Sequence, residues 1–120
     1  MIETKTFGNF YFKLTDAGNL IGEYLNDEIF DVRPESAWRQ PQTTKKCFEG
    51  KYLSTWYEPK PSECVTAELV ITRESNAVDV FKLVWQHSGK PIFQGRAMLC
   101  DGVLIGNYQS AKIMPSSSSE

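Results

Sequence analysis

The amino-acid sequence predicts one all-β domain, an antiparallel up-and-down β-barrel of seven or eight strands with one short helical insertion. Three observations support this fold class: apolar residues recur mostly at every second position, short turn sequences separate these runs, and one strand pattern with a central glycine occurs twice. The chain has 120 residues, of which 41% are hydrophobic, which suffices for one core but not for two independent domains. We therefore expect a single barrel domain over residues 1–114, followed by a disordered serine-rich tail over residues 115–120.

Seven segments are expected to form strands, because apolar and aromatic residues alternate along them with polar ones. The clearest case is the segment in which Phe81, Leu83 and Trp85 share one face, while Lys82 and Gln86 share the other. Turn sequences rich in Gly, Asp, Asn and Ser lie between neighbouring segments and are typical of hairpins. In chain order the expected strands are residues 7–14, 19–26, 47–57, 65–73, 79–87, 92–100 and 103–110.

The segment between residues 27 and 44 breaks this pattern. Pro34 is well suited to the first position of a helix and Pro41 ends whatever follows, so we expect a short helix over residues 34–40. A closed up-and-down barrel needs an even number of strands. We prefer residues 29–33 as the eighth strand, with residues 111–114 or an imperfect closure as the alternatives.

A repeated pattern, G-x-L-I-G-x-Y, occupies residues 18–24 and again residues 102–108. In both copies the central glycine and the tyrosine share one face of the expected strand. Glycine within a strand marks a bend or a close approach of another chain segment. Curved strands with inward-facing glycines favour a barrel over a flat sheet.

The second half of the chain resembles a known group of proteins. The strand V-F-K-L-V-W (residues 80–85), the pattern F-x-G-x-A-x-L (residues 93–99), an Asp-Gly turn and L-I-G-x-Y (residues 104–108) are similar to the small calycin-like barrels, which include lipocalins, fatty-acid-binding proteins and avidins. The resemblance covers residues 47–110. It departs from lipocalins, since no G-x-W opens the first strand, and from avidins, since no biotin-contacting set can be matched. It implies the barrel fold and, more weakly, a ligand inside it.

Charge and composition argue against several classes of function. The 13 basic and 15 acidic residues give a formal net charge of −2, and no basic groove for nucleic acid is expected. Apolar runs fall far short of the roughly 20 residues that a membrane-spanning helix needs. The first residues include no apolar stretch typical of a secretory signal, so we expect a cytoplasmic protein. Three cysteines and one histidine lack the spacing of a metal site, and no cofactor-binding motif occurs, so neither metal nor cofactor is expected.

Aromatic residues on interior faces favour the binding of a small molecule. Tyr24, Trp56, Trp85 and Tyr108 are expected to face the interior, with glycines and alanines opposite them. Trp38, in the inserted segment, is expected either to cover the opening or to anchor the segment by packing. Large aromatic residues next to small ones also occur in a filled barrel, so the pattern alone leaves open whether the interior is packed or hollow.

We therefore predict non-catalytic binding of a small, largely apolar or aromatic ligand in the barrel interior, with Tyr24, Trp38, Trp56, Trp85 and Tyr108 as the binding residues. The alternative is an interaction module with a filled core that acts as a homodimer or larger homo-oligomer. A less favoured alternative is an enzyme, in which His87 is the only general base that titrates near neutral pH.

Overall fold

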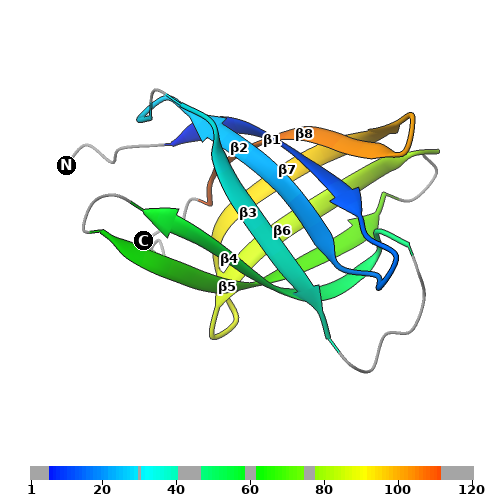
Figure 1. Cartoon of the computed structure of the whole chain (residues 1–120), viewed down its shortest axis with the longest axis horizontal. Helices are drawn as coiled ribbons and strands as arrows, with labels where there is room; N and C mark the ends of the chain where they lie inside the picture. The colour runs from blue at the N-terminus through cyan, green and yellow to red at the C-terminus, as the bar shows by residue number, and fades with distance from the viewer. Residues whose placement is uncertain (1–5, 30, 41–46, 59–61, 75–77, 112–120) are drawn as a thin grey trace, which may run out of the picture.

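The chain folds into a closed barrel of eight antiparallel strands that follow one another in chain order (Figure 1). The computed structural model describes residues 6–29, 31–40, 47–58, 62–74 and 78–111. Each strand pairs with the next, and β8 pairs with β1 to close the barrel. The strands are β1 (Phe7–Leu14), β2 (Leu20–Asn26), β3 (Arg33–Arg39), β4 (Gly50–Glu58), β5 (Glu63–Arg73), β6 (Val80–His87), β7 (Lys90–Cys100) and β8 (Val103–Ser110).

The predicted fold class is confirmed, as are the seven predicted strands. The largest difference at a strand end is at β4, which was expected to start at residue 47 and starts at Gly50. Alternate residues are buried along the strands; in β6 these are Phe81, Leu83 and Trp85. No helix long and apolar enough to cross a membrane occurs in the described ranges. The tail over residues 115–120 lies outside them.

The predicted helix over residues 34–40 is wrong, because this segment forms β3 and is the eighth strand of the barrel. Of the two segments proposed for that strand, the first, residues 29–33, contributes Arg33 to β3. In the second, Ala111 follows the end of β8, and residues 112–114 lie outside the described residues. Pro34 is compatible with a strand here, because it lies at the start of β3. It is opposite Glu23 of β2, whereas the pairing of β3 with β4 begins one residue later. Proline, which lacks an N–H donor, is tolerated at such positions.

The alternation in β3 was missed because its inward positions carry unusual residues. Glu35 and Ala37 are buried, while Trp38 on the outer face is 65% exposed. The usual order of apolar inside and polar outside is thus reversed at the largest side chain of the strand. Sequence periodicity cannot detect a strand whose interior face presents a carboxyl group and a methyl group.

Strands β2 and β8, which carry the repeated pattern, lie on either side of β1. Phe10 of β1 is opposite Tyr24 of β2 and Gly106 of β8. Glycine is required at the centre of the repeat, because a Cβ atom on Gly106 would lie 2.3 Å from the carbonyl oxygen of Arg96. The repeat places Tyr24 and Tyr108 at the same end of the barrel, with ring centroids 6.4 Å apart.

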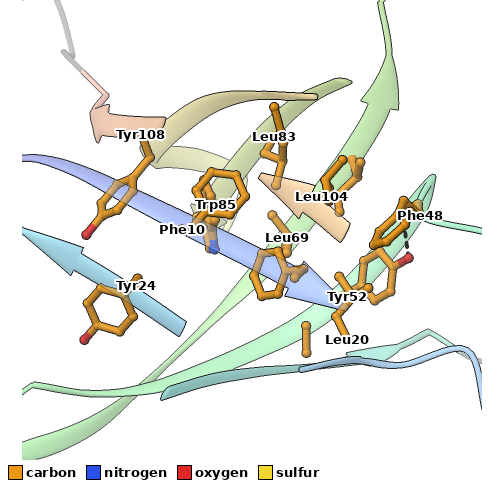
Figure 2. Close-up of a cluster of buried hydrophobic side chains, with 14 of the residues drawn as sticks. Phe10, Leu20, Tyr24, Phe48, Tyr52, Leu69, Leu83, Trp85, Leu104 and Tyr108 are labelled. Atoms are coloured by element: carbon orange, nitrogen blue, oxygen red, sulfur yellow. Dashed lines mark hydrogen bonds between the residues drawn. The ribbon is translucent and has the colours of Figure 1, made fainter. Parts of the chain in front are cut away.

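The opposite end of the barrel is closed by side chains. Phe48 packs against Phe81 with ring centroids 6.4 Å apart. The Tyr52 hydroxyl donates to the Phe48 carbonyl oxygen at 2.7 Å, as Figure 2 shows. Arg39 connects three chain segments here, because its guanidinium donates to the carbonyl oxygens of Gly18 (2.7 Å) and Glu49 (3.0 Å) and lies over the Tyr52 ring, 4.7 Å from its centroid.

We expect Arg39→Lys to lower the free energy of unfolding by about 2 kcal/mol, because a single ammonium group cannot replace several hydrogen bonds from a planar guanidinium. Urea denaturation measures the change. Arg96→Lys is the matched control, since Arg96 lies on the surface and pairs with Glu74, and we expect it to have little effect. Equal effects of the two substitutions would show that Arg39 does not hold this end together.

Candidate functional site

The end of the barrel opposite Arg39 contains a cavity of about 410 Å³. It lies between the last residues of β2, β4, β6 and β8 and the first residues of β3 and β7. Figure 2 shows Tyr24 and Tyr108 at this end of the core, with their hydroxyl groups pointing away from Phe48 and Tyr52. The lining residues are Thr6, Tyr24, Asn26, Glu28, Ile29, Glu35, Trp56, Glu58, Trp85, Phe93 and Tyr108.

Five aromatic residues line the cavity, namely Tyr24, Trp56, Trp85, Phe93 and Tyr108. Successive ring centroids lie 6.4 Å apart from Tyr24 to Tyr108 and 5.5 Å apart from Tyr108 to Phe93. Phe93 is in turn 6.2 Å from Trp56, and Trp85 is 5.9 Å from Tyr108. The rings meet at tilted or edge-on angles, which are favourable for aromatic pairs. They come from every cavity-lining strand except β3, which lies between β2 and β4.

On β3 the cavity is lined by the carboxyl group of Glu35. This residue is only 7% exposed. Its Oε2 accepts hydrogen bonds from Ser54 Oγ at 2.6 Å and from Trp85 Nε1 at 2.8 Å. These bonds connect β3 to its neighbour β4 and, across the interior, to β6. They offset part of the cost of burying a polar group, and they fix the orientation of the carboxyl.

Burial raises the pKa of the Glu35 carboxyl from its ordinary 4.5 to about 7, and the hydrogen bonds from Ser54 and Trp85 oppose this rise. Desolvation disfavours the charged form of a carboxyl, so it is the dominant effect. Glu35 therefore changes its charge near neutral pH. The carboxyl is a weak acid placed inside an aromatic cavity.

The other polar groups of the cavity lie nearer its mouth. The Tyr24 hydroxyl donates to the carbonyl oxygen of Tyr57 at 3.2 Å, and Asn26 Nδ2 donates to the Tyr108 hydroxyl at 3.0 Å. Burial raises the pKa of Tyr24 to about 12 and also raises the pKa of Tyr108. Both phenols thus keep their protons at neutral pH. The Tyr108 hydroxyl accepts from Asn26 and retains its own proton to donate.

Four of the five predicted binding residues, Tyr24, Trp56, Trp85 and Tyr108, line the cavity together. Trp38 does not, and its expected place over the opening or packed against the barrel needs correction. It lies on the outer face of β3, 65% exposed, since the segment is a strand in which residues 35 and 37 face inward. Sequence analysis missed Glu35 and Phe93 as cavity residues.

Other side chains that could take part in catalysis or binding lie away from this cavity. His87 is exposed at the end of β6 and does not line it. Among the described residues, no three His, Cys, Asp or Glu side chains are placed to hold a metal ion. A second hollow of about 730 Å³ lies over β1, β6, β7 and β8, where exposed polar residues such as Lys82, Arg96 and Asn107 line it. The aromatic cavity with Glu35 is therefore the candidate site.

Comparisons with protein-family models, with curated protein sequences and with solved structures found no match to this chain. The candidate site is accordingly defined by its own geometry.

The raised pKa of Glu35 predicts how stability depends on pH. Between pH 4.5 and 7 the unfolded chain has released this proton while the folded chain still binds it, so the free energy of unfolding falls as pH rises. At 1.36 kcal/mol per pKa unit this loss amounts to about 3 kcal/mol. Glu35→Gln removes the titrating group and keeps an acceptor oxygen for Ser54 and Trp85.

We expect the stability of the Glu35→Gln variant, relative to wild type, to increase from pH 4 to pH 8 by about this amount. Urea denaturation of both proteins across this range measures the difference, and other carboxyl groups cancel in the comparison. Parallel stability profiles would show that the folded barrel does not perturb Glu35.

Proposed function

We propose that this protein binds a small, largely apolar or aromatic molecule in the open end of its barrel, without catalysing a reaction on it. The observation that carries the proposal is the cavity of about 410 Å³ with aromatic walls. Small-molecule sites have volumes of about 300–1,000 Å³, are mostly apolar and contain a few fixed polar groups. Glu35, Tyr108 and Asn26 supply such groups here.

The strand order supports a relationship with the calycin-like barrels, which we propose together with this function. An eight-stranded closed barrel encloses an interior that its side chains fill or that holds one small ligand. In this protein side chains fill the interior at one end of the barrel, and the other end is hollow. We also propose a cytoplasmic location, supported by the three free cysteines.

An interaction module that acts as a homo-oligomer remains the alternative to ligand binding. Trp38 and Leu53 are opposite each other on β3 and β4 and are 65% and 45% exposed. An outward-facing apolar pair of this kind favours a contact with a second copy of the chain. The filled core that belonged to this alternative is not supported, because the open end is hollow. Binding and self-association are compatible, since the pair lies outside the barrel.

Indole N–H resonances in a ¹H–¹⁵N NMR spectrum provide the test of ligand binding. We expect titration with naphthylmethanol, an uncharged aromatic probe, to shift the resonances of Trp56 and Trp85, which line the cavity. The resonance of Trp38 should stay unchanged, and it serves as an internal control. Trp→Phe variants assign the three signals. If no resonance moves, or if only that of Trp38 does, the proposed function is wrong.

A further inference from the structure

The charged groups that line the cavity are all acidic. Glu28, Glu35 and Glu58 contribute carboxyl groups, whereas none of the described lining residues is a lysine, arginine or histidine. The two carboxyl groups at the rim each accept a hydrogen bond from the protein. Thr6 Oγ1 donates to Glu28 Oε2 at 3.3 Å, and Trp56 Nε1 donates to Glu58 Oε2 at 3.1 Å. Glu28 is also exposed to solvent. Glu35 is the buried member of the set.

The hydrogen bonds of Glu35 leave one oxygen for a ligand. Both donors, Ser54 and Trp85, bind Oε2, and no donor within the described part of the chain is bonded to Oε1. A carboxylate oxygen accepts hydrogen bonds only, so its complement must be a donor. An ionised donor forms the stronger bond in a site largely removed from water.

Glu35 lies deeper in the barrel than the mouth. Tyr24 of β2 is opposite Arg33, and Glu35 is two residues further into β3, a rise of about 7 Å along the strand. A molecule that reaches Glu35 therefore passes Tyr24 and meets Trp56, which is opposite Glu35 on β4. Aromatic faces attract cations as well as apolar groups, so the walls and the carboxyl favour the same kind of ligand.

We propose that the cavity selects an aromatic molecule with a protonated amine, whose N–H group donates to Glu35 Oε1 while its ring lies between the aromatic walls. This inference rests on the proposed function and adds the chemical class of the ligand. Glu35 contacts the amine directly, and Ser54 and Trp85 act as positioning residues that orient the carboxyl.

The remaining charges near the site are consistent with this choice. Among the described residues, Arg33 is a nearby cation, but it does not line the cavity, and its Nη2 lies 3.5 Å from Asp31 Oδ1. Its ion pair is thus with Asp31 and not with Glu35. Tyr24 and Tyr108 stay neutral at the pH of interest, because burial raises the pKa of each. Glu28 and Glu58 at the rim add negative charge, which attracts a cation.

The experiment compares two probes with the same aromatic body. Naphthylmethylamine carries an ammonium group near neutral pH, and naphthylmethanol carries a hydroxyl group at the same position. Calorimetric titration at pH 8, where Glu35 is ionised, should show the amine binding about tenfold more tightly or better. Naphthylacetate, which is an anion, should bind more weakly than either.

Two variants locate the source of this preference. Glu35→Gln should reduce it, measured as the ratio of the two affinities in the same variant, to less than about threefold. Glu68→Gln is the matched control, because it removes the same charge from the outer face of β5, where Glu68 accepts from Gln86. It should preserve the preference. An effect of equal size in both variants would attribute the preference to net charge and overturn the role of Glu35.

The pH dependence of the wild-type protein tests the inference without any variant. Affinity for the amine should be about tenfold lower at pH 6 than at pH 8, because only the ionised carboxyl binds it and burial raises the pKa of Glu35 to about 7. Affinity for naphthylmethanol should not change. Equal binding of amine and alcohol, or tighter binding of naphthylacetate, would overturn the inference and leave the proposed function intact. If none of the three probes binds, the proposed function itself fails.

Discussion

A carboxyl group buried inside the barrel is the constraint on which the open end depends. Glu35 is held by donors from β4 and β6, Ser54 and Trp85, and these bonds make its burial tolerable. They also fix Trp85, whose ring forms part of the cavity wall, and leave Oε1 without a donor among the described residues. The Glu35 side chain therefore connects strands, lines the cavity and determines the class of ligand that we propose.

The two ends of the barrel differ because different side chains occupy them. At one end Phe48 and Tyr52 fill the interior, and Tyr52 and Arg39 donate hydrogen bonds to carbonyl oxygens of the loops. At the other end the aromatic rings line the cavity, and the hydroxyl groups of Tyr24 and Tyr108 form hydrogen bonds at the rim (Figure 2). An eight-stranded barrel is just wide enough for either arrangement. In the described part of the chain, the barrel is packed at the end of Phe48 and Tyr52 and hollow at the end of Tyr24 and Tyr108.

The sequence was sufficient to predict seven strands and four of the cavity residues, because both follow from alternation. The repeat was informative for the same reason: its glycines permit close strand approach, and its tyrosines reach the same end. It was insufficient for β3. A strand that buries Glu35 and exposes Trp38 has no apolar period, and Pro34 and Pro41 suggested a helix. The departure from the usual pattern coincides with the candidate site, as expected where function competes with foldability. The cavity itself depends on how side chains from distant strands pack, which periodicity does not describe.

The open end of the barrel depends on Glu35 being a desolvated carboxyl that lines the cavity. Carbon-13 NMR of the glutamate side-chain carboxyl groups, followed as a function of pH and assigned with Glu35→Gln, measures its pKa directly. The structure predicts a midpoint of about 7, since burial dominates over the hydrogen bonds from Ser54 and Trp85. A midpoint near the ordinary value of 4.5 would contradict the account, because it would mean that water reaches the carboxyl freely and that no dry cavity surrounds it.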